Sequence, residues 1–326
     1  MPKTCSEFRR LTLHGPTMGT RWSVTCDAES GMDTQLLHQA LAASVLRVDS
    51  QMSPWLSCSD LNRLNQAPLG AWLELPPEIL EVLACALECA RLSRGAFDPA
   101  VGALVDAWGF GATRTAPDAA SIRAAATAAH PSTHQSIELD LVAGRVRKHA
   151  PIRLDLCGIA KGYAVDRMIA ALHTHGIRHA LAALDGELRA LGSQWDGAPW
   201  AVAIESPETG RRAVHSVIEL QDLAVATSGN YRRYWDIGDA RVAHTMDVRP
   251  GARVGPVRND VTSVTVLANT GMQADAWATA LLVAGPGEGL ALAQRMGLEA
   301  LWLLRRNTAL VTVGVGRFAP ECKKPA

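Results

Sequence analysis

The spacing of apolar and polar residues predicts a chain that mixes helices with strands. Apolar residues recur at the period of an amphipathic helix in five segments: 33–52, 76–93, 160–174, 273–283 and 288–296. Proline at the start of the second segment and Gly176 just beyond the third are typical of helix ends. We therefore expect five helices, with a further short helix inside a loose insertion at 113–134.

Shorter segments with alternating or β-branched apolar residues predict strands. They lie at 21–26, 180–184, 188–191, 200–205, 214–220, 223–227 and 261–267. Two hairpins are expected, one from 137–141 and 144–148 and one from 301–304 and 309–313. Runs of strands mixed with paired helices indicate an α+β fold rather than a doubly wound sheet.

Composition narrows the class of protein. The chain has 326 residues, 48% of them hydrophobic, and its 32 Lys and Arg balance 32 Asp and Glu. This apolar content is sufficient for a globular core. Balanced charge argues against a partner such as nucleic acid or a membrane surface, since their binders carry a basic excess. No window reaches the roughly 18 apolar residues of a membrane-spanning helix, so no membrane insertion is expected.

The start of the chain and the cysteines predict a cytoplasmic protein. The first ten residues lack the apolar stretch of a secretory signal, and Cys5 has no apolar run before it. Seven cysteines at irregular spacing fit reduced thiols. Cys85 and Cys89 are interpreted as core residues of a helix, because no matching Cys or His pair follows them.

The run Asp155-Leu-Cys-Gly-Ile-Ala-Lys-Gly-Tyr-Ala-Val-Asp166 is the first candidate for chemistry. An apolar segment, 151–154, reads as a strand and leads through small residues into a helix that opens at Ala160. The unpaired N–H groups and positive dipole of such a helix start favour an anion. Lys161 is a candidate for neutralising a diphosphate, and a solvated surface lysine is the alternative.

Two later segments supply oxygen ligands and a base. Asp275 and Thr279 lie four residues apart on a predicted helix, so they share one face and can offer hard oxygens to magnesium. Helix capping and a bond back to the helix are the alternatives for these residue types. The loop Ala243-His-Thr-Met-Asp-Val-Arg-Pro-Gly251 contains His244, whose imidazole can take a proton from an attacking hydroxyl. Asp247 can orient that ring or bind a phosphate-bound water.

Motifs of this kind occur in order along most of the chain. Besides the lysine turn, the histidine loop and the Asp275 helix, they are Gly15-Pro-Thr-Met-Gly-Thr20, Met52-Ser-Pro-Trp55 with Ser59-Asp-Leu-Asn-Arg-Leu-Asn65, Gly95-Ala-Phe-Asp-Pro99 with Val101-Gly102 and Trp108-Gly-Phe110, and Thr227-Ser-Gly-Asn-Tyr-Arg-Arg233. Together they resemble the ApbE family, the magnesium-dependent FAD:protein FMN transferases. Each motif is modest, but seven in the right order are hard to obtain by chance.

The resemblance implies one α+β domain, related to the T-fold, in which mixed sheets and helices surround a central flavin cleft. Residues 14–318 would form this domain, between an N-terminal extension at 1–13 and a C-terminal tail at 319–326.

The resemblance also implies roles for individual residues. Magnesium would be held by Asp275, Thr279 and the backbone carbonyl of Ala160, and His244 and Asp247 would be catalytic. The flavin or adenine pocket would be formed by Met18, Trp55, Ala96, Phe97, Asp98, Cys157, Gly158, Lys161, Tyr163, Met246 and Ala276. Ordinary core packing is the alternative for the pocket residues, above all for Phe97.

Three positions depart from the family pattern. Asp185-Gly186-Glu187 stands where the family has Gly-Gly-Asp, Cys157 replaces the first glycine of the lysine turn, and Val248 replaces a proline. The first change puts a bulkier acidic group where the family has glycine. Acceptor or nucleotide preference therefore stays open.

The predicted function is transfer of FMN from FAD to a Thr or Ser of an acceptor flavoprotein, with release of AMP. If water replaces the hydroxyl, the protein is an FAD pyrophosphatase that yields FMN and AMP. A non-catalytic FAD-binding protein is the third interpretation. The acceptor, the oligomeric state and the choice between magnesium and manganese are not encoded in these motifs.

Overall fold

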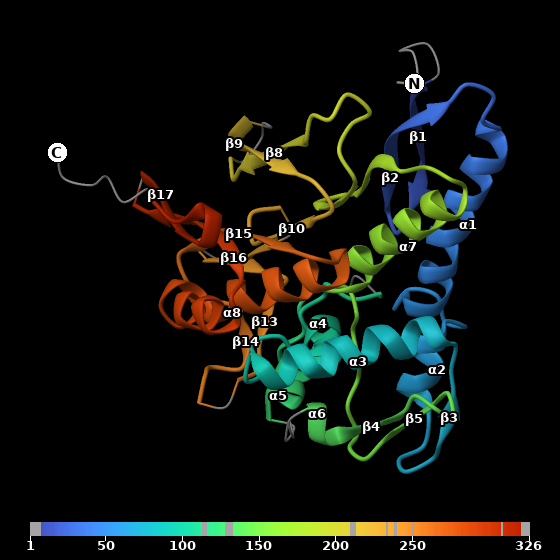
Figure 1. Cartoon of the computed structure of the whole chain (residues 1–326). Coiled ribbons are helices and arrows are strands. Elements are labelled where there is room, and N and C mark those ends of the chain that lie inside the picture. The colour runs from blue at the N-terminus through green and yellow to red at the C-terminus, as the bar shows by residue number, and fades with distance from the viewer. Residues whose placement is uncertain are drawn as a thin grey trace.

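The computed structural model shows an α+β arrangement built around one large sheet (Figure 1). It describes residues 8–112, 116–127, 133–208, 213–232, 234–237, 240–249, 251–307 and 309–320. The mixture of helices with antiparallel strands confirms the α+β fold class predicted from the sequence. The predicted insertion at 113–134 falls partly outside the described residues, and its described part contains α5 (Ala119–Thr127) and the start of α6 (Thr133–Ser136).

Eight strands form the large sheet in the order β1-β2-β6-β7-β10-β15-β16-β17, and every neighbouring pair is antiparallel. Their bounds are Phe8–Thr17, Thr20–Glu29, His179–Leu184, Glu187–Leu191, Ala224–Gly229, Val261–Ala268, Glu299–Arg306 and Ala309–Val315. Short turns join the antiparallel neighbours β1–β2, β6–β7 and β16–β17, and longer connections lead to the other neighbours. The hairpin predicted around Arg306-Asn307 is β16–β17.

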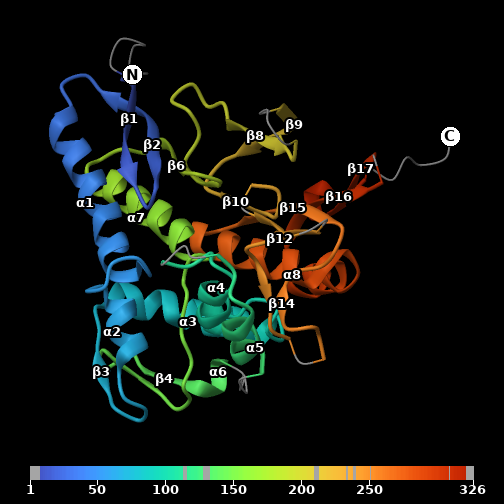
Figure 2. The ribbon, with the colours of Figure 1, turned by 180° about the vertical axis from the view of Figure 1, so that it is seen from behind.

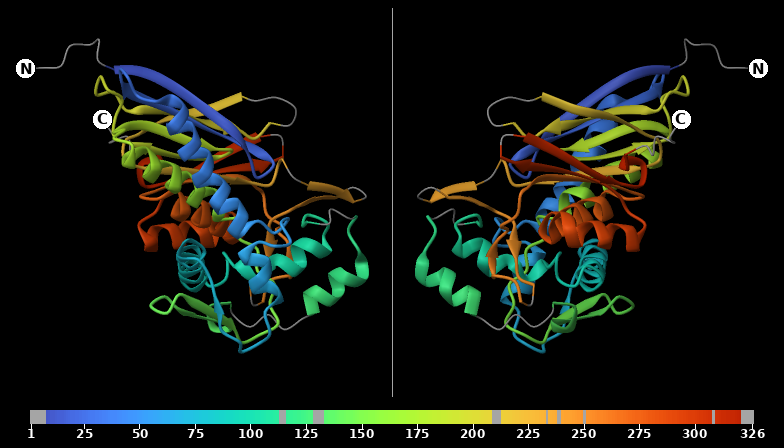
Figure 3. Two further views of the ribbon diagram at one scale, coloured as in Figure 1. Left: turned by 90° about the vertical axis from the view of Figure 1, so that its right-hand side faces the viewer. Right: turned by 90° about the vertical axis from the view of Figure 1, so that its left-hand side faces the viewer.

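Helices cover one face of this sheet. Figure 3 shows the strands as an upper layer, with α7 (Ala160–Thr174) and α8 (Gly271–Met296) directly beneath. The first of these packs on β6, β7 and α1 (Thr34–Met52), and α8 packs on β10, β15 and α3 (Pro77–Leu92). The main core lies between these helices and the sheet, with Trp22, Val264 and Trp302 almost fully buried.

The opposite face of the sheet carries a second, smaller core. Strands β8 (Trp200–Ser206) and β9 (Ala213–Leu220) form a hairpin whose Trp200, Val202 and Ile204 pack against Val225 and Leu301 of the large sheet. Figure 2 shows this hairpin at the same end of the molecule as the β1–β2 hairpin. The alternating burial along β8 explains the strand pattern seen at 200–205.

The remaining elements are short. Helix α2 spans Asp60–Gln66. Helix α4 (Gly102–Ala107) directly follows the 3₁₀ turn Pro99–Val101, and a second 3₁₀ turn lies at Gly316–Phe318. The three small sheets are formed by β3 (Leu73–Glu74), β5 (Arg145–Lys148) and β4 (Ile137–Asp140), by β11 (Tyr234–Ile237) and β12 (Ala240–Ala243), and by β13 (Met246–Asp247) and β14 (Gly255–Pro256).

Two expectations need correction. Residues 8–13, expected in an N-terminal extension, form part of β1 and pair with β2. Residues 151–154 are not a strand, because they bond to helix residues and not to a neighbouring strand: Arg153 O accepts from Gly102 N at the start of α4, and Leu154 N donates to the Asn65 side chain of α2. The two helices expected at 273–283 and 288–296 are confirmed: they lie on either side of a kink within α8, where Gly285 has a non-helical φ of 72° before Pro286.

Helix α8 also meets the length and composition of a membrane span. However, 61% of its most apolar window is buried inside the protein. Buried core helices satisfy the same criterion, so this match is weak support for a span.

Candidate functional site

A cavity of about 530 Å³ lies on the strand side of the α7 and α8 N-termini. Its walls come from the β1–β2 hairpin, the end of α1, β8, β10, the β12–β13 loop and the first turns of α7 and α8. All but three of the residues predicted for the site line it: Met18, Trp55, Ala96, Phe97, Asp98, Cys157, Gly158, Ala160, Lys161, His244, Met246, Asp275 and Thr279. Segments far apart in the sequence thus meet in one place.

Three predicted residues do not line the cavity. Tyr163 is buried in the core and donates its hydroxyl hydrogen to Glu81, and Ala276 is fully buried. Each helical residue turns the side chain by about 100°, so neighbours of a cavity-facing residue point elsewhere. Asp247 binds the backbone N–H and the guanidinium of Arg249 instead.

The N-termini of α7 and α8 meet at two glycines. A Cβ on Gly162 would stand 2.1 Å from Gly271 O, and a Cβ on Gly271 would stand 2.4 Å from Gly162 O. Side chains are therefore excluded from both positions. The close approach allows Gly162 N to donate to Asp275 Oδ2 at 3.0 Å, which joins the lysine turn to the candidate metal ligand.

Oxygen atoms gather around Asp275. This residue is 2% exposed, and Thr279 one helical turn later bonds through its hydroxyl to Ser228 Oγ at 3.0 Å. Burial raises the pKa of Asp275 to about 6, opposed by the charge of Lys161 and the Gly162 N–H. A carboxylate buried at such a cost, beside two hydroxyls and a cavity, fits a hard cation.

The donor set defines which cation would fit. Within the described residues no group of three or more His, Cys, Asp or Glu could hold a metal. One carboxylate with hydroxyl and carbonyl oxygens suits Mg²⁺, which keeps waters and phosphate oxygens as its other ligands. The residues present thus fit magnesium in the company of a phosphate, rather than a closed all-protein metal cage.

Lys161 is held by a buried carboxylate. Its Nζ lies 2.8 and 2.9 Å from the two oxygens of Glu187, which is 2% exposed, and 3.6 Å from Asp185. Burial lowers the pKa of Lys161, yet Glu187, Asp275 and Asp185 together raise it above its ordinary value. Burial also raises the pKa of Glu187, but the two-pronged contact supports a charged pair. The solvated-lysine alternative is therefore wrong.

We expect Lys161→Ala to weaken FAD binding and to destabilise the fold. Breaking a buried ion pair costs about 3–5 kcal/mol because one charge is left unpaired. The Lys161 side chain is 28% exposed, and solvent screening should reduce the loss to about 2–3 kcal/mol. Denaturant unfolding measures it. Lys161→Met combined with Glu187→Gln should recover most of the stability but not the FAD affinity. An unchanged free energy of unfolding in the single variant would contradict the pairing.

Asp185, one of the departures from the family pattern, occupies an unusual backbone position. Its φ is 56°, in the left-handed region that glycine adopts freely and that Asp tolerates better than most residues. Its carboxylate lies 3.5 Å from Arg232, which also pairs with Glu205 at the end of β8. Negative and positive side chains therefore alternate from Glu205 of β8 through Arg232 and Asp185 to Lys161.

His244 lies at the bend between β12 and β13, as the loop position predicted. Its ring meets Phe110 edge to face, with centroids 6.2 Å apart, and both residues line the cavity. Phe110 also lies 6.2 Å from the Trp235 ring. Packing against Phe110 thus helps to position the imidazole in the lining of the cavity.

Sequence reasoning missed several residues of this site. Ser228 belongs to a quoted motif, but nothing in its spacing indicates the bond to Thr279. Asp166 ends the lysine-turn motif and accepts from the N–H groups of Gly271 and Met272, which fixes the start of α8. The sequence signals for this contact were the carboxylate of Asp166 at the end of a motif and Gly271 just before an apolar helix.

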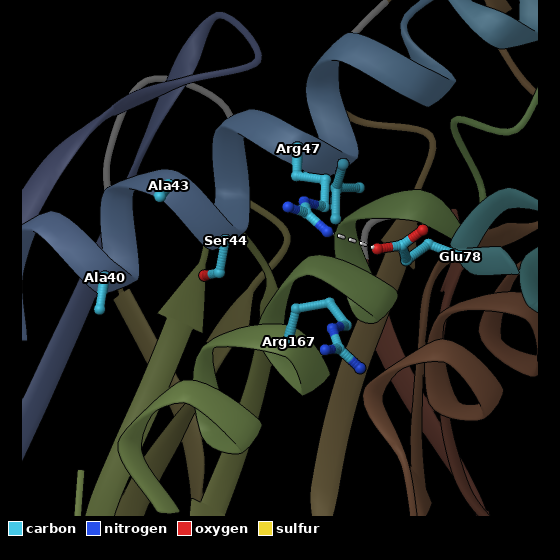
Figure 4. Close-up of a pocket in the computed structure, with 7 residues that line it drawn as sticks. Ala40, Ala43, Ser44, Arg47, Glu78 and Arg167 are labelled. Carbon is cyan, nitrogen blue, oxygen red and sulfur yellow. Dashed lines mark hydrogen bonds and ion pairs between the residues drawn. The ribbon is translucent and has the colours of Figure 1, made fainter. Parts of the chain in front are cut away.

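A second hollow, of about 200 Å³, lies between α1, α3 and α7 (Figure 4). Its polar groups are Ser44, Arg167 and the ion pair of Arg47 with Glu78, whose arginine side chain is 67% exposed. No residue of the predicted site lies there. The larger cavity is therefore the candidate site.

Comparisons with known proteins agree on one family. The ApbE family model matches residues 18–302. The FAD:protein FMN transferase of Vibrio cholerae is 33% identical over 97% of this chain and 93% of its own, and that of Haemophilus influenzae is 31% identical over 96% and 91%. The apo crystal structure of the Pseudomonas stutzeri flavinyl transferase ApbE superposes with a TM-score of 0.84, at 34% identity over 97% of this chain and 98% of that one.

Proposed function

We propose that this chain, which belongs to the ApbE family, transfers FMN from FAD to a Thr or Ser of an acceptor flavoprotein and releases AMP. One observation carries the proposal. Lys161, Asp275 with Thr279, and His244 come from three separate segments and line one cavity. Relatives named FAD:protein FMN transferase match almost the whole chain, which supports the same reaction here.

In this proposal the FAD diphosphate lies at the start of α7. The first-turn N–H groups and the Lys161 ammonium favour the negative phosphates. Asp275, Thr279 and the carbonyl of Ala160 would hold magnesium, which supplies charge neutralisation at the phosphate oxygens. Ser228 positions the Thr279 hydroxyl through their mutual hydrogen bond.

His244 is proposed as the general base. It takes the proton from the acceptor hydroxyl, and that oxygen forms a bond to the FMN phosphorus. The bond from this phosphorus to the bridging oxygen breaks, and the oxygen leaves on AMP. Positioning and charge neutralisation do most of the catalysis in such transfers, so the chain needs no covalent intermediate.

The setting of the reaction is part of the proposal. The five cysteines within the described residues are all free, in keeping with a reducing compartment. We therefore include a cytoplasmic location and a cytoplasmic acceptor.

We expect AMP to form from FAD and magnesium only when an acceptor protein is added. The acceptor hydroxyl is the nucleophile, so without it the diphosphate remains intact. AMP release is measured by chromatography with and without the flavin-free acceptor of the Vibrio cholerae relative, and the Vibrio cholerae enzyme serves as the positive control. AMP at the same rate without acceptor would favour FAD hydrolysis, and no AMP in either case would favour FAD binding alone.

A further inference from the structure

Strand β8 has an unpaired edge that borders the cavity. Among the described residues it pairs with β9 alone, so no described strand satisfies its other row of backbone N–H and C=O groups. Val202, Ala203, Ile204 and Glu205 of this strand line the cavity. Since an unpaired strand edge is a template for another extended chain, this edge can be completed by a peptide.

The groove beside this edge has a wall and a floor suited to a peptide. The same cavity is lined by Met18 and Arg21 of the β1–β2 hairpin and by Leu188 and Val225 of the large sheet, whose side chains are apolar. Both hairpins lie at the same end of the molecule (Figure 2). None of the ion pairs between described residues involves Arg21, whose guanidinium lies 3.4 Å from Nδ1 of the His14 ring. An acidic side chain would therefore find a cationic partner here.

The edge lacks the usual protection against pairing. Soluble proteins guard exposed edges with lysine, proline or inward-pointing charge. Residues 200–204 of β8, Trp-Ala-Val-Ala-Ile, include none of these. The first charged residue of β8 is Glu205. It pairs with Arg232, which also pairs with Asp185, and Asp185 lies beside Lys161. A docked chain would thus run along an uncharged edge and end beside the charged part of the cavity.

We propose that the acceptor segment bearing the modified Thr or Ser binds as an added strand on the free edge of β8. This inference rests on the proposed function, because that reaction brings an acceptor hydroxyl into the cavity that holds FAD. A peptide fits this edge better than FAD does, since it supplies a matching row of N–H and C=O groups at strand spacing. Arg21 favours an acidic residue in the segment.

Two exposed alanines on β8 provide a matched test. Ala201 and Ala203 lie on the same face of the strand, but Ala203 lines the cavity and Ala201 does not. We expect Ala203→Asp to raise the KM for the acceptor about tenfold or more, because docking would desolvate the new charge. Ala201→Asp should change it less than about twofold, as for an ordinary surface substitution. The dissociation constant for FAD should be unchanged in both.

The probe is the flavin-free acceptor of the Vibrio cholerae relative, assayed for FMN transfer with the Vibrio cholerae enzyme in parallel. Amide hydrogen exchange of β8 should also slow when this acceptor binds.

Equal effects at both alanines, no effect at Ala203, or unprotected β8 amides would overturn the docking proposal while leaving the transferase intact. A weakened FAD affinity in Ala203→Asp would assign the edge to the flavin instead. If the wild-type chain fails to transfer while the control enzyme succeeds, the proposed function itself fails.

Discussion

Asp275→Asn is expected to lower magnesium-dependent FMN transfer by on the order of 100-fold or more without harming the fold. The amide oxygen can still accept the Gly162 N–H, but the carboxylate proposed to hold the metal is gone. Several kcal/mol of charge stabilisation are lost with the metal, and each 1.36 kcal/mol is about tenfold in rate. Because burial raises the pKa of Asp275 to about 6, its charge is a cost near pH 7, and removing it should not lower stability.

The separation of stability from activity is what tests this role. Thermal unfolding should be unchanged or slightly higher in Asp275→Asn, and added magnesium with FAD should no longer raise the melting temperature. Asp260→Asn, at a surface ion pair with Arg306, is the matched control and should behave as wild type. Wild-type turnover of Asp275→Asn at ordinary magnesium would show that the metal is held elsewhere.

His244→Asn is expected to retain FAD binding and to lose FMN transfer by roughly two to four orders of magnitude, the usual worth of general-base help. Asparagine keeps polarity and much of the shape of histidine, so the packing loss is small. The edge-to-face contact with Phe110 is worth only about 0.5–1.5 kcal/mol. Single-turnover transfer and fluorescence titration of FAD separate the chemical step from binding.

Phe110→Leu is the companion variant. It removes the same aromatic contact but leaves the imidazole, so its loss of transfer should be much smaller. Normal transfer by His244→Asn would assign the base to another group. Loss of FAD binding would make His244 a pocket residue.

Local patterns predicted most of the fold. Helix periodicity located α1, α3 and α7 to within one or two residues, and the pairing of β16 with β17 followed from the turn at Asn307, whose φ is 55°. Strand β1 was missed because most of its side chains are at least partly exposed, so alternation is weak. The strand expected at 151–154 has the apolar composition of a strand but no neighbour to pair with.

The site was predicted from motif order, and its chemistry only in part. A sequence motif does not show which way each side chain points from a helix. Tyr163 and Ala276 were therefore predicted to line the pocket, although they face the core. The ion pair of Lys161 with Glu187 joins residues 26 positions apart on a helix and a strand. Such pairs depend on tertiary packing, and spacing along the chain does not reveal them.

Mass spectrometry of the acceptor tests the central claim most directly. After incubation with FAD, magnesium and this protein, the flavin-free acceptor of the Vibrio cholerae relative should carry one FMN on a Thr or Ser through a phosphoester, with an equal amount of AMP in solution. The Asp275→Asn protein should leave the acceptor unmodified. An unmodified acceptor with the wild-type protein, while the Vibrio cholerae enzyme modifies it in the same assay, would contradict the assignment as a flavin transferase.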